Sequence, residues 1–387
     1  MRILIVATKS PHPACDGGRL ALWHTVRGLA DAGHELTLVA PAEPRDHSPG
    51  FARDLPYRRI EVAARPRAAP AAVLDALVRG RSLGVARHAL AAVRAAVADV
   101  LEGWRPHVVH AEQLHAFANC APALARSIPV VLRMQNVESG LREQQALRQG
   151  PRPAWRAEAS RLRGDEREAI ARAACTVTLT ADDAVALRAL QPRAQIVPVA
   201  PAFPARLPAG PALEGEPAIA LAGSAGWWPN ADGERWLLRE VWPLVAARLP
   251  RARLHCFGGD GSHQAERVQR HRAPADSVAA FPRDAIAVVP LHAASGIRMR
   301  ILEAWARGLP VVATPVAAQG LAVAHGRELL LADSPARFAE AIAHVHADAV
   351  LRAALVAGGA AALRRDHDVA RQTRALLDVY DAALATP

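Results

Sequence analysis

Short apolar runs alternate with longer segments of helical periodicity along this chain. Residues 2–8 form the first apolar run and predict a strand, and the loop after it is rich in proline, glycine and aspartate. Residues 20–32 place apolar side chains at helical spacing, and residues 35–40 form the next apolar run. This order of strand, loop, helix and strand is typical of a parallel sheet that helices cover.

The second half of the chain repeats this order. Residues 218–222 predict a strand and residues 233–249 a helix. Between the halves, residues 199–217 are rich in proline and predict a linker. Further strands are expected at residues 108–110, 128–132, 175–179, 253–257, 285–290 and 309–313. We therefore predict an α/β fold, with one Rossmann-like domain over residues 1–198 and a second over residues 218–369.

The segment over residues 295–314 combines the features of a phosphate site. Ser295 and Gly296 form a loop of small residues, and a helix is predicted from Ile297 to Arg307. Gly308 ends this helix, and the apolar run after it predicts a buried strand. A small-residue loop that opens a helix exposes backbone N–H groups and the positive end of the helix dipole, which suits a diphosphate.

Three charged side chains on this helix fit the same interpretation. Arg298 and Arg300 lie in the first turn, where the helix dipole does not favour cations, so an anion bound between them would explain their placement. Glu303 lies further along the helix, where its carboxylate can accept hydrogen bonds from a ribose diol. The alternative is an ordinary crossover helix with an exposed glutamate.

This stretch resembles the signature of the GT-B glycosyltransferases of family 4, the glycosyl transferases group 1. From Glu303 onward, the sequence Glu-Ala-Trp-Ala-Arg-Gly-Leu-Pro-Val-Val-Ala-Thr is similar to the second glutamate of the family's pair and the Gly-x-Pro-Val-Val run after it. The first glutamate, which usually helps to hold the donor sugar, is replaced by Ser295. The resemblance covers essentially the full chain. It implies two Rossmann-like domains that face each other across a cleft, and a C-terminal helix over residues 370–387 that crosses back to the first domain.

The loop after residue 222 is similar to a Gly-x-x-x-Trp-x-Pro-Asn segment of a subgroup of this family. The resemblance implies donor binding by Gly223, Trp227 and Asn230, with Asn230 also expected to cap the next helix. Core packing is the alternative for the tryptophan. Many relatives place Arg and Lys directly after this strand, and this chain has neither before Arg235, so diphosphate binding would fall to the 295–300 segment.

The loop after the first strand holds Asp16, Gly17 and Gly18 at the carboxyl end of a predicted sheet strand, where α/β sheets bind ligands. In similar enzymes this loop faces the donor phosphate and the acceptor. We therefore expect Gly18 to contact the donor, and Asp16 and Gly17 to contact the acceptor. The alternative is a plain tight turn.

Two further polar segments follow predicted strands. Relatives often place a histidine and an acidic residue where this chain has His110 and Glu112, which makes both candidates for exchanging a proton or a hydrogen bond with the reacting sugar. His110 as a core histidine is the alternative. Asn136 and Glu138 resemble a His-Asn-x-Glu segment of the family and are expected to bind acceptor hydroxyls, with a loop-capping role as the alternative.

The composition indicates the expected compartment and binding partners of this chain. Of its 387 residues, four are cysteines far apart in the sequence, without metal or redox spacing, so a reduced cytoplasmic protein with no metal site is expected. The net charge of +10 comes almost entirely from arginine. Residues 64–101 read as a helical stretch with interspersed arginines, which suits either a peripheral contact with the anionic inner face of a membrane or a solvated face. Nucleic acid is not expected, because aromatic residues are few near this stretch.

These features predict a glycosyltransferase that moves a sugar from a nucleotide diphosphate donor to an acceptor hydroxyl on a glycan, a glycolipid or a small molecule. By resemblance, the anomeric configuration is retained and neither a metal nor another cofactor is required, because the nucleotide sugar is a co-substrate. A nucleotide-sugar 2-epimerase of the same fold and a non-catalytic sugar-nucleotide-binding subunit are the alternatives. A dehydrogenase is disfavoured, because the glycines at residues 258–261 do not form the G-x-G-x-x-G fingerprint.

Overall fold

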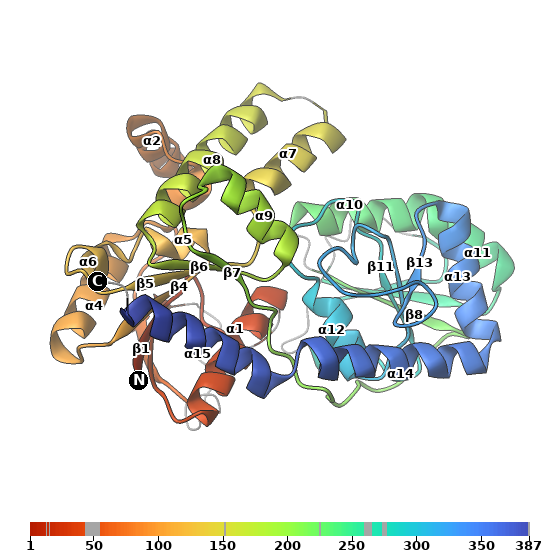
Figure 1. The fold of residues 1–387 in the computed structure, drawn as a ribbon. Coiled ribbons are helices and arrows are strands. Elements are labelled where there is room, and N and C mark those ends of the chain that lie inside the picture. The colour runs from red at the N-terminus through yellow and green to blue at the C-terminus, as the bar shows by residue number, and fades with distance from the viewer. Residues whose placement is uncertain are drawn as a thin grey trace. The chain divides into compact units, whose positions relative to one another are not determined.

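The computed structural model describes residues 1–12, 14, 16–42, 55–150, 152–223, 226–258, 265–272 and 277–385. These residues form two compact units (Figure 1). Unit 1 comprises residues 1–12, 22–202 and 370–387, and unit 2 comprises residues 13–21 and 203–369. Each unit contains one parallel sheet with helices packed on it, which confirms the predicted α/β class.

The sheet of unit 1 has the strand order β3-β2-β1-β4-β5-β6-β7, and each neighbouring pair is parallel. Along β1, Leu4 and Val6 belong to one core cluster, whereas Ile3 and Ile5 belong to another. Successive side chains of a strand point to opposite faces, so both faces of this sheet are buried. The strands are β1 (Arg2–Val6), β2 (Glu35–Pro41), β3 (Arg58–Val62), β4 (Val108–Glu112), β5 (Val130–Met134), β6 (Cys175–Thr178) and β7 (Ile196–Pro198).

The helices that cover this sheet come from both ends of the chain. The C-terminal helix contributes Leu376, Val379 and Tyr380 to the same core cluster as Ile3 and Ile5. The helices are α1 (Gly17–Asp31, whose first residues belong to unit 2), α2 (Ala69–Arg79), α3 (Leu83–His88), α4 (Ala91–Gly103), α5 (Leu114–Phe117), α6 (Ala121–Leu124), α7 (Glu138–Arg148), α8 (Pro153–Arg172), α9 (Ala181–Leu190) and α15 (Val369–Ala385).

The sheet of unit 2 is also parallel and has the order β10-β9-β8-β11-β12-β13. Its strands are β8 (Ala218–Ala222), β9 (Arg253–Phe257), β10 (Val268–His271), β11 (Ile286–Val289), β12 (Val311–Ala313) and β13 (Leu330–Leu331). Its helices are α10 (Trp228–Trp236), the π-helical η1 (Leu237–Val241), α11 (Trp242–Arg248), the 3-10 helix η2 (Val278–Ala280), α12 (Met299–Ala306), α13 (Pro335–Ala347) and α14 (Ala349–Asp366).

The strand orders locate the place where each sheet is suited to bind a ligand. In unit 1 the chain places β2 on one side of β1 and β4 on the other, and in unit 2 it places β9 and β11 on the two sides of β8. Open α/β sheets bind ligands outside the carboxyl ends of the strands at such a switch in direction. Of the site residues predicted from the sequence, His110 and Glu112 lie in β4, Asn136 and Glu138 follow β5, and Gly223 follows β8.

Two predicted helices begin earlier than expected. The α1 helix begins at Gly17 rather than residue 20, because Asp16 Oδ1 accepts a hydrogen bond from the Arg19 backbone N–H at 3.0 Å and so caps the helix. The α10 helix begins at Trp228 rather than residue 233, with Pro229 in its first turn. Asn230 was expected to cap this helix, but it lies inside the helix. Residues 224, 225 and 259–261 of the predicted loops lie outside the described residues.

The predicted linker and the arginine-bearing helical stretch also differ from expectation. Residues 203–217 belong to unit 2, and the backbone N–H of Leu207 donates to the carbonyl of Ala306 at 2.7 Å. The stretch over residues 64–101 is three helices rather than one. Gly80, with φ of 66°, ends α2, and the side chain of Ser82 caps α3. Among the described residues, no single helix has the length and apolarity to cross a membrane, although residues 335–347 and 349–385, bent by 102°, meet that requirement as a pair.

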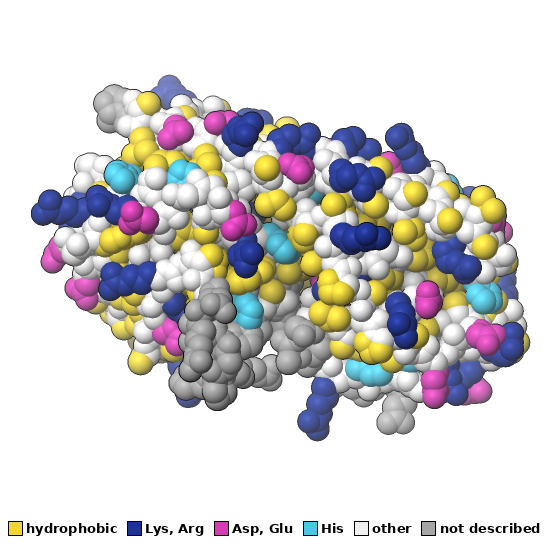
Figure 2. All heavy atoms as spheres, turned by 90° about the horizontal axis from the view of Figure 1, so that it is seen from below, with side chains coloured by type: hydrophobic (Ala, Val, Ile, Leu, Met, Phe, Trp, Pro, Cys, Tyr) yellow, Lys and Arg dark blue, Asp and Glu magenta, His cyan; other side chains and the backbone are white. Residues whose placement is uncertain are grey.

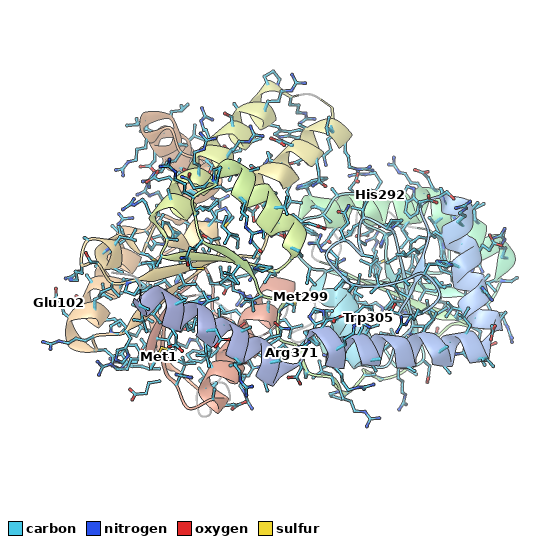
Figure 3. The ribbon with its side chains drawn as sticks, viewed as in Figure 1. Met1, Glu102, His292, Met299, Trp305 and Arg371 are labelled. Atoms are coloured by element: carbon cyan, nitrogen blue, oxygen red, sulfur yellow. The ribbon has the colours of Figure 1, made fainter. Side chains whose placement is uncertain are left out.

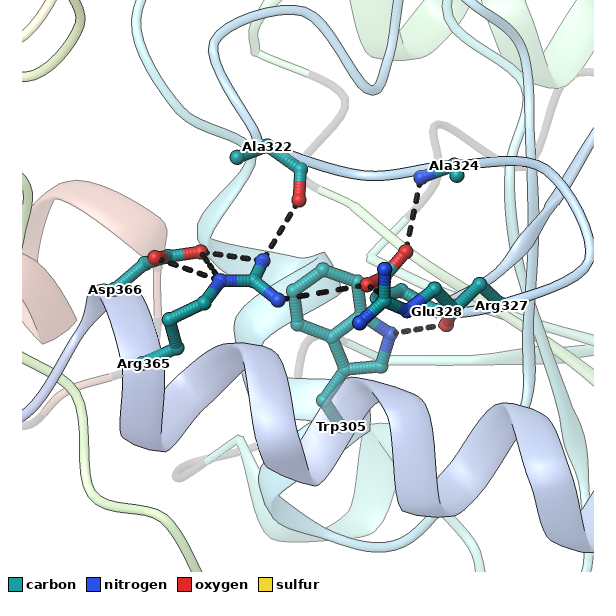
Figure 4. Close-up of polar contacts among 7 residues, drawn as sticks. All are labelled: Trp305, Ala322, Ala324, Arg327, Glu328, Arg365 and Asp366. Carbon is teal, nitrogen blue, oxygen red and sulfur yellow. Dashed lines mark hydrogen bonds and ion pairs between the residues drawn. The ribbon is translucent and has the colours of Figure 1, made fainter.

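Helix α14 packs so closely on α12 and on the loop at Arg327 that two glycines are required. A Cβ atom on Gly358 would lie 1.9 Å from the carbonyl oxygen of Arg327, and one on Gly359 would lie 2.3 Å from Cδ1 of Trp305. The Trp305 indole Nε1 donates to the carbonyl of Glu328 at 3.1 Å (Figure 4). Two glycines within a helix lower its intrinsic stability, so their presence here reflects the space that Trp305 and the neighbouring loop occupy.

We predict that Gly358→Ala lowers the free energy of unfolding by about 2–3 kcal/mol, because the new methyl group meets a backbone oxygen that cannot move without shifting the loop. The matched control is Gly164→Ala in α8, where a Cβ atom meets nothing within 4 Å. That substitution should be neutral or stabilise by up to about 1 kcal/mol. Thermal and urea unfolding measure both effects, and equal stability of Gly358→Ala and the wild type would contradict this account.

Candidate functional site

The loop before α12 has the backbone that the small residues were expected to permit. Gly296 adopts a φ of 68°, in the left-handed region that favours glycine. Helix α12 begins at Met299, two residues later than predicted, with Arg298 at its N-cap position. Gly308 has a φ of 72° and follows the C-cap residue Arg307, as predicted. Figure 3 labels Met299 and Trp305 near the two ends of this helix.

Three of the predicted donor-binding residues meet at the carboxyl end of β8. Arg300 Nη2 donates to Asn230 Oδ1 at 2.6 Å. A Cβ atom on Gly223 would lie 3.2 Å from Arg300 Nη1 and 3.3 Å from the Asn230 amide, so glycine allows this close approach. Together with Glu234, Phe257 and other residues, these three line a small pocket.

The charge of Arg300 is available to an anion in this pocket. Its partner is the neutral amide of Asn230, and no carboxylate in the described part of the chain lies within ion-pairing distance. Burial lowers the pKa of Arg300 to about 10, against the opposing effect of Glu303, so the guanidinium stays protonated at neutral pH. A half-buried cation held by an amide at a pocket wall is suited to binding phosphate oxygens.

Arg298 and Trp227 also lie together. The guanidinium carbon of Arg298 lies 5.4 Å from the centroid of the Trp227 ring, a cation–π contact. Arg298 is buried, Ile297 is buried beside it, and Ser295 is half-buried. Contact of Trp227 with a donor stays a prediction.

Glu303 has a partner that the sequence analysis missed. Its Oε1 accepts hydrogen bonds from Arg307 Nε at 3.1 Å and Nη2 at 2.7 Å. Arg307 also donates to the Ser277 hydroxyl at 3.1 Å and to the carbonyl of Pro208. The spacing of four residues on one helix was the available signal, because residues four apart face each other. Arg307 therefore holds the buried Glu303 carboxylate in one orientation, and its role as a ribose ligand stays a prediction.

The loop predicted at residues 16–18 is the first turn of a helix, so the tight-turn alternative is wrong. The Asp16 carboxylate caps α1 and also pairs with Arg19 Nε at 3.3 Å. A Cβ atom on Gly17 would lie 3.1 Å from Cβ of Met299, the first residue of α12. Gly17 therefore allows the first turn of α1 to lie against the start of α12 within unit 2, with Gly18 beside it.

The prediction of a catalytic role for His110 requires a correction. The imidazole is fully buried, and its Nδ1 and Nε2 atoms lie 2.6 Å from the Tyr380 hydroxyl and 2.9 Å from Glu112 Oε2. Burial would raise the pKa of Glu112, but Arg133, the hydrogen bond of His110 and other neighbours lower it below its ordinary value. With Glu112 ionised, Nε2 donates to it and Nδ1 accepts from Tyr380. His110 is thus a core histidine that joins β4 to α15.

Glu112 is likewise enclosed by protein groups rather than open to a substrate. It is 3% exposed, and its Oε1 accepts from Gln135 Nε2 at 2.6 Å. Gln135 in turn accepts from Gln113, a non-glycine residue with a φ of 73°. Strained backbone of this kind persists where the surroundings enforce it and is often found at functional sites. The hydrogen bonds that join Glu112, Gln135 and Gln113 therefore hold the carboxyl ends of β4 and β5 in place.

Asn136 and Glu138 lie together at the start of α7. Asn136 Nδ2 donates to Glu138 Oε1 at 3.3 Å, and burial raises the pKa of Glu138. The residue that caps this helix is Glu166 of α8, which accepts from the Ser139 backbone N–H at 3.1 Å and from the Ser139 hydroxyl at 2.5 Å. Because Glu166 is distant in sequence, no local pattern indicated this role. Asn136 is half-buried, and acceptor binding by these two residues stays a prediction.

The buried Glu166 should make stability depend on pH. Burial raises its pKa to about 7 from an ordinary value of 4.5, so the native state holds a proton that the unfolded chain has lost. Its stabilising contribution is complete below pH 4.5 and is lost as the pH rises through 7. Each pKa unit is worth about 1.4 kcal/mol, so we predict that Glu166 by itself lowers the free energy of unfolding by on the order of 2–3 kcal/mol across this range. Burial lowers the pKa values of His24 and His115 to about 4, so these two histidines act in the opposite direction.

Glu166→Gln should remove this contribution, because the amide does not titrate, so the free energy of unfolding of the variant should rise relative to that of the wild type as the pH increases from 4.5 to 8. The matched control is Glu168→Gln on the same helix, where an exposed carboxylate pairs with Arg172 and should leave the wild-type slope unchanged. Urea unfolding at several pH values between 4.5 and 8 measures the slope. Parallel slopes for Glu166→Gln and the wild type would show that Glu166 does not titrate in this range.

Solved GT-B glycosyltransferases share this fold of two parallel α/β units. A sucrose-phosphate synthase from Thermosynechococcus elongatus is 16% identical, with a TM-score of 0.75 over 100% of this chain and 99% of that one. HepE from Anabaena, solved in complex with UDP-glucose, is 14% identical, with a TM-score of 0.68 over 99% of this chain and 100% of that one. TarM from S. aureus is 12% identical, with a TM-score of 0.58 over 75% of this chain and 59% of that one.

The family follows from two sequence models that together cover most of the chain. Residues 216–348 match the model described as glycosyl transferases group 1, and residues 16–202 match the glycosyl transferase 4-like domain. No curated protein matches this chain by sequence comparison. The chain belongs to the group 1 glycosyltransferases of the family 4 type.

Proposed function

We propose that this chain transfers a sugar from a nucleotide diphosphate donor to an acceptor hydroxyl. The observation that carries the proposal is the convergence of Arg300, Asn230 and Gly223 at the carboxyl end of β8, with Arg298 close by on the same helix. Negative charge develops on the diphosphate as the glycosidic bond to it breaks. Preorganised cations at that position stabilise the charge and lower the barrier.

The predicted donor residues of α12 and of the loop before it have defined parts in this proposal. Arg298 and Arg300 hold the diphosphate, assisted by backbone N–H groups of residues 295–297. Glu303, oriented by Arg307, accepts hydrogen bonds from the ribose diol. Two guanidinium groups supply the positive charge that a divalent ion provides in other transferases, so the proposed reaction proceeds without a metal. Retention of the anomeric configuration is part of the proposal.

The acceptor is proposed to be a glycan hydroxyl. HepE has been solved with UDP and glucose, and TarM with Fondaparinux, α-GlcNAc-glycerol and UDP, which supports UDP-type donors and sugar acceptors in proteins of this fold. Asn136 and Glu138 are the proposed acceptor ligands of unit 1. Interconversion of a nucleotide sugar without an acceptor would instead indicate a 2-epimerase, and donor binding without turnover would indicate a non-catalytic subunit.

Thermal shift with UDP, GDP, ADP, TDP and CMP, each with and without magnesium, tests the donor site. We predict that one nucleoside diphosphate raises the unfolding temperature equally in both conditions. A ligand at one hundred times its Kd adds about 2.7 kcal/mol to the free energy of unfolding. No shift with any nucleotide would contradict the proposed donor site, and a shift that requires magnesium would contradict metal independence.

Arg300→Ala should weaken binding of that nucleotide at least about tenfold, because a charge-assisted hydrogen bond is worth about 1.5–3 kcal/mol. The control is Arg337→Ala on α13, an exposed arginine of the same unit, which should leave the Kd unchanged. Isothermal calorimetry measures both values. A Kd for Arg300→Ala within twofold of the wild type would remove Arg300 from the diphosphate site.

A further inference from the structure

Helix α2 turns its larger apolar side chains outward. Ala72 and Ala76 form its buried face, whereas Val73, Leu74, Leu77 and Val78 are 44%, 64%, 62% and 75% exposed. We call these four residues the α2 face. Their spacing places them on one side of the helix. A surface helix of a globular protein normally packs its large apolar side chains inward, so this arrangement requires an explanation.

The α2 face differs from the other exposed apolar side chains of the described residues. Leu147, Val185 and Val350 are highly exposed, but each lies on a different helix. Single exposed apolar residues are normal on protein surfaces, whereas a contiguous group marks an interaction site. Figure 1 shows α2 at the periphery of unit 1, beyond α8.

A cluster of arginines lies beside the α2 face. Asp75 pairs with Arg67 and Arg79, each at 3.0 Å. The pKa of Arg94 is lowered by burial and then by the nearby charges of Arg67, Arg79 and Arg81, with Asp75 acting in the opposite direction. Arg67, Arg79 and Arg94 lie around the carboxylate of Asp75, and Arg81 lies near both this cluster and Asp165. Four guanidinium groups thus face two carboxylates, and this part of the surface carries a positive charge.

The charge also argues against a second copy of this chain as the occupant. A two-fold dimer through the α2 face would bring two sets of arginines together at its rim, which is unfavourable. On the face drawn in Figure 2, Lys and Arg side chains lie among acidic, neutral and hydrophobic groups. Apolar side chains with clustered arginines beside them are complementary to a partner that has an apolar interior and an anionic boundary.

We propose that the α2 face docks on an anionic lipid bilayer. Leu74, Leu77 and Val78 enter the boundary between headgroups and acyl chains, and the arginines lie at the level of the lipid phosphates. Long arginine side chains suit this position, because their stems pack on apolar surface while the guanidinium reaches the headgroup. This inference goes beyond sugar transfer and does not depend on a bound donor.

Sedimentation of the full chain with lipid vesicles tests the proposal without any donor or acceptor. Vesicles of phosphatidylcholine alone are compared with vesicles in which part of it is replaced by phosphatidylglycerol, at low and high salt. The protein should sediment with the anionic vesicles and dissociate at high salt, because ions screen the arginines. Failure of the wild type to bind anionic vesicles at low salt would overturn the proposal.

Variants test the apolar component of this surface. Leu74→Asp with Leu77→Asp should lower the partition coefficient at least about tenfold, because both changes place a carboxylate at the lipid boundary. The matched control is Val350→Asp on α14, which is 80% exposed and should bind as the wild type does. All three positions are exposed, so the unfolding temperature should stay near that of the wild type and confirm that each variant is folded.

Two further outcomes would overturn the proposal. One is equal vesicle binding by the Leu74→Asp, Leu77→Asp variant and the wild type. The other is a wild-type dimer in analytical ultracentrifugation that this variant abolishes while vesicle binding is absent, which would assign the α2 face to a second copy of the chain. Neither outcome bears on nucleotide binding by unit 2, so the two proposals fail independently.

Discussion

The burial of α12 is the constraint on which the site of unit 2 depends. Seven of its eight residues are buried, and the helix and its flanks carry Arg298, Arg300, Glu303 and Arg307. Charges removed from water are costly unless they are paired or hydrogen-bonded. Each of these side chains therefore has a specific neighbour: a tryptophan ring, an amide or the opposite charge. Gly359 of α14 leaves the space that Trp305 of α12 occupies, and Gly358 leaves the space for the carbonyl of Arg327.

This constraint connects packing to function. A helix that cannot shift keeps its guanidinium groups in fixed positions at the carboxyl end of β8, so no reorganisation is needed when charge develops on a leaving diphosphate. Arg307 extends the same rigidity, because it links Glu303 to Ser277 and to the carbonyl of Pro208. The proline-rich segment is thus part of the support for the site in unit 2 rather than a free linker.

The sequence predicted those features that local pattern and charge determine. The helix after Ser295, its end at Gly308 and the convergence of Arg300 with the loop after β8 follow from periodicity, glycine chemistry and sheet topology. The partners of buried polar groups were not predictable in this way. The Tyr380 hydroxyl that bonds His110 is 270 residues away, and Glu166 caps a helix that begins 28 residues earlier, so neither contact leaves a local signal. The same holds for Asp16, because whether it caps a helix or faces a ligand depends on where the first turn begins.

A crystal structure of this chain with its tightest-binding nucleoside diphosphate tests the central claim most directly. The account predicts diphosphate oxygens within hydrogen-bonding distance of Arg298 and Arg300, and ribose hydroxyls on the Glu303 carboxylate with its bonds to Arg307 intact. A nucleotide bound elsewhere in unit 2, with these three side chains in contact only with protein, would contradict it.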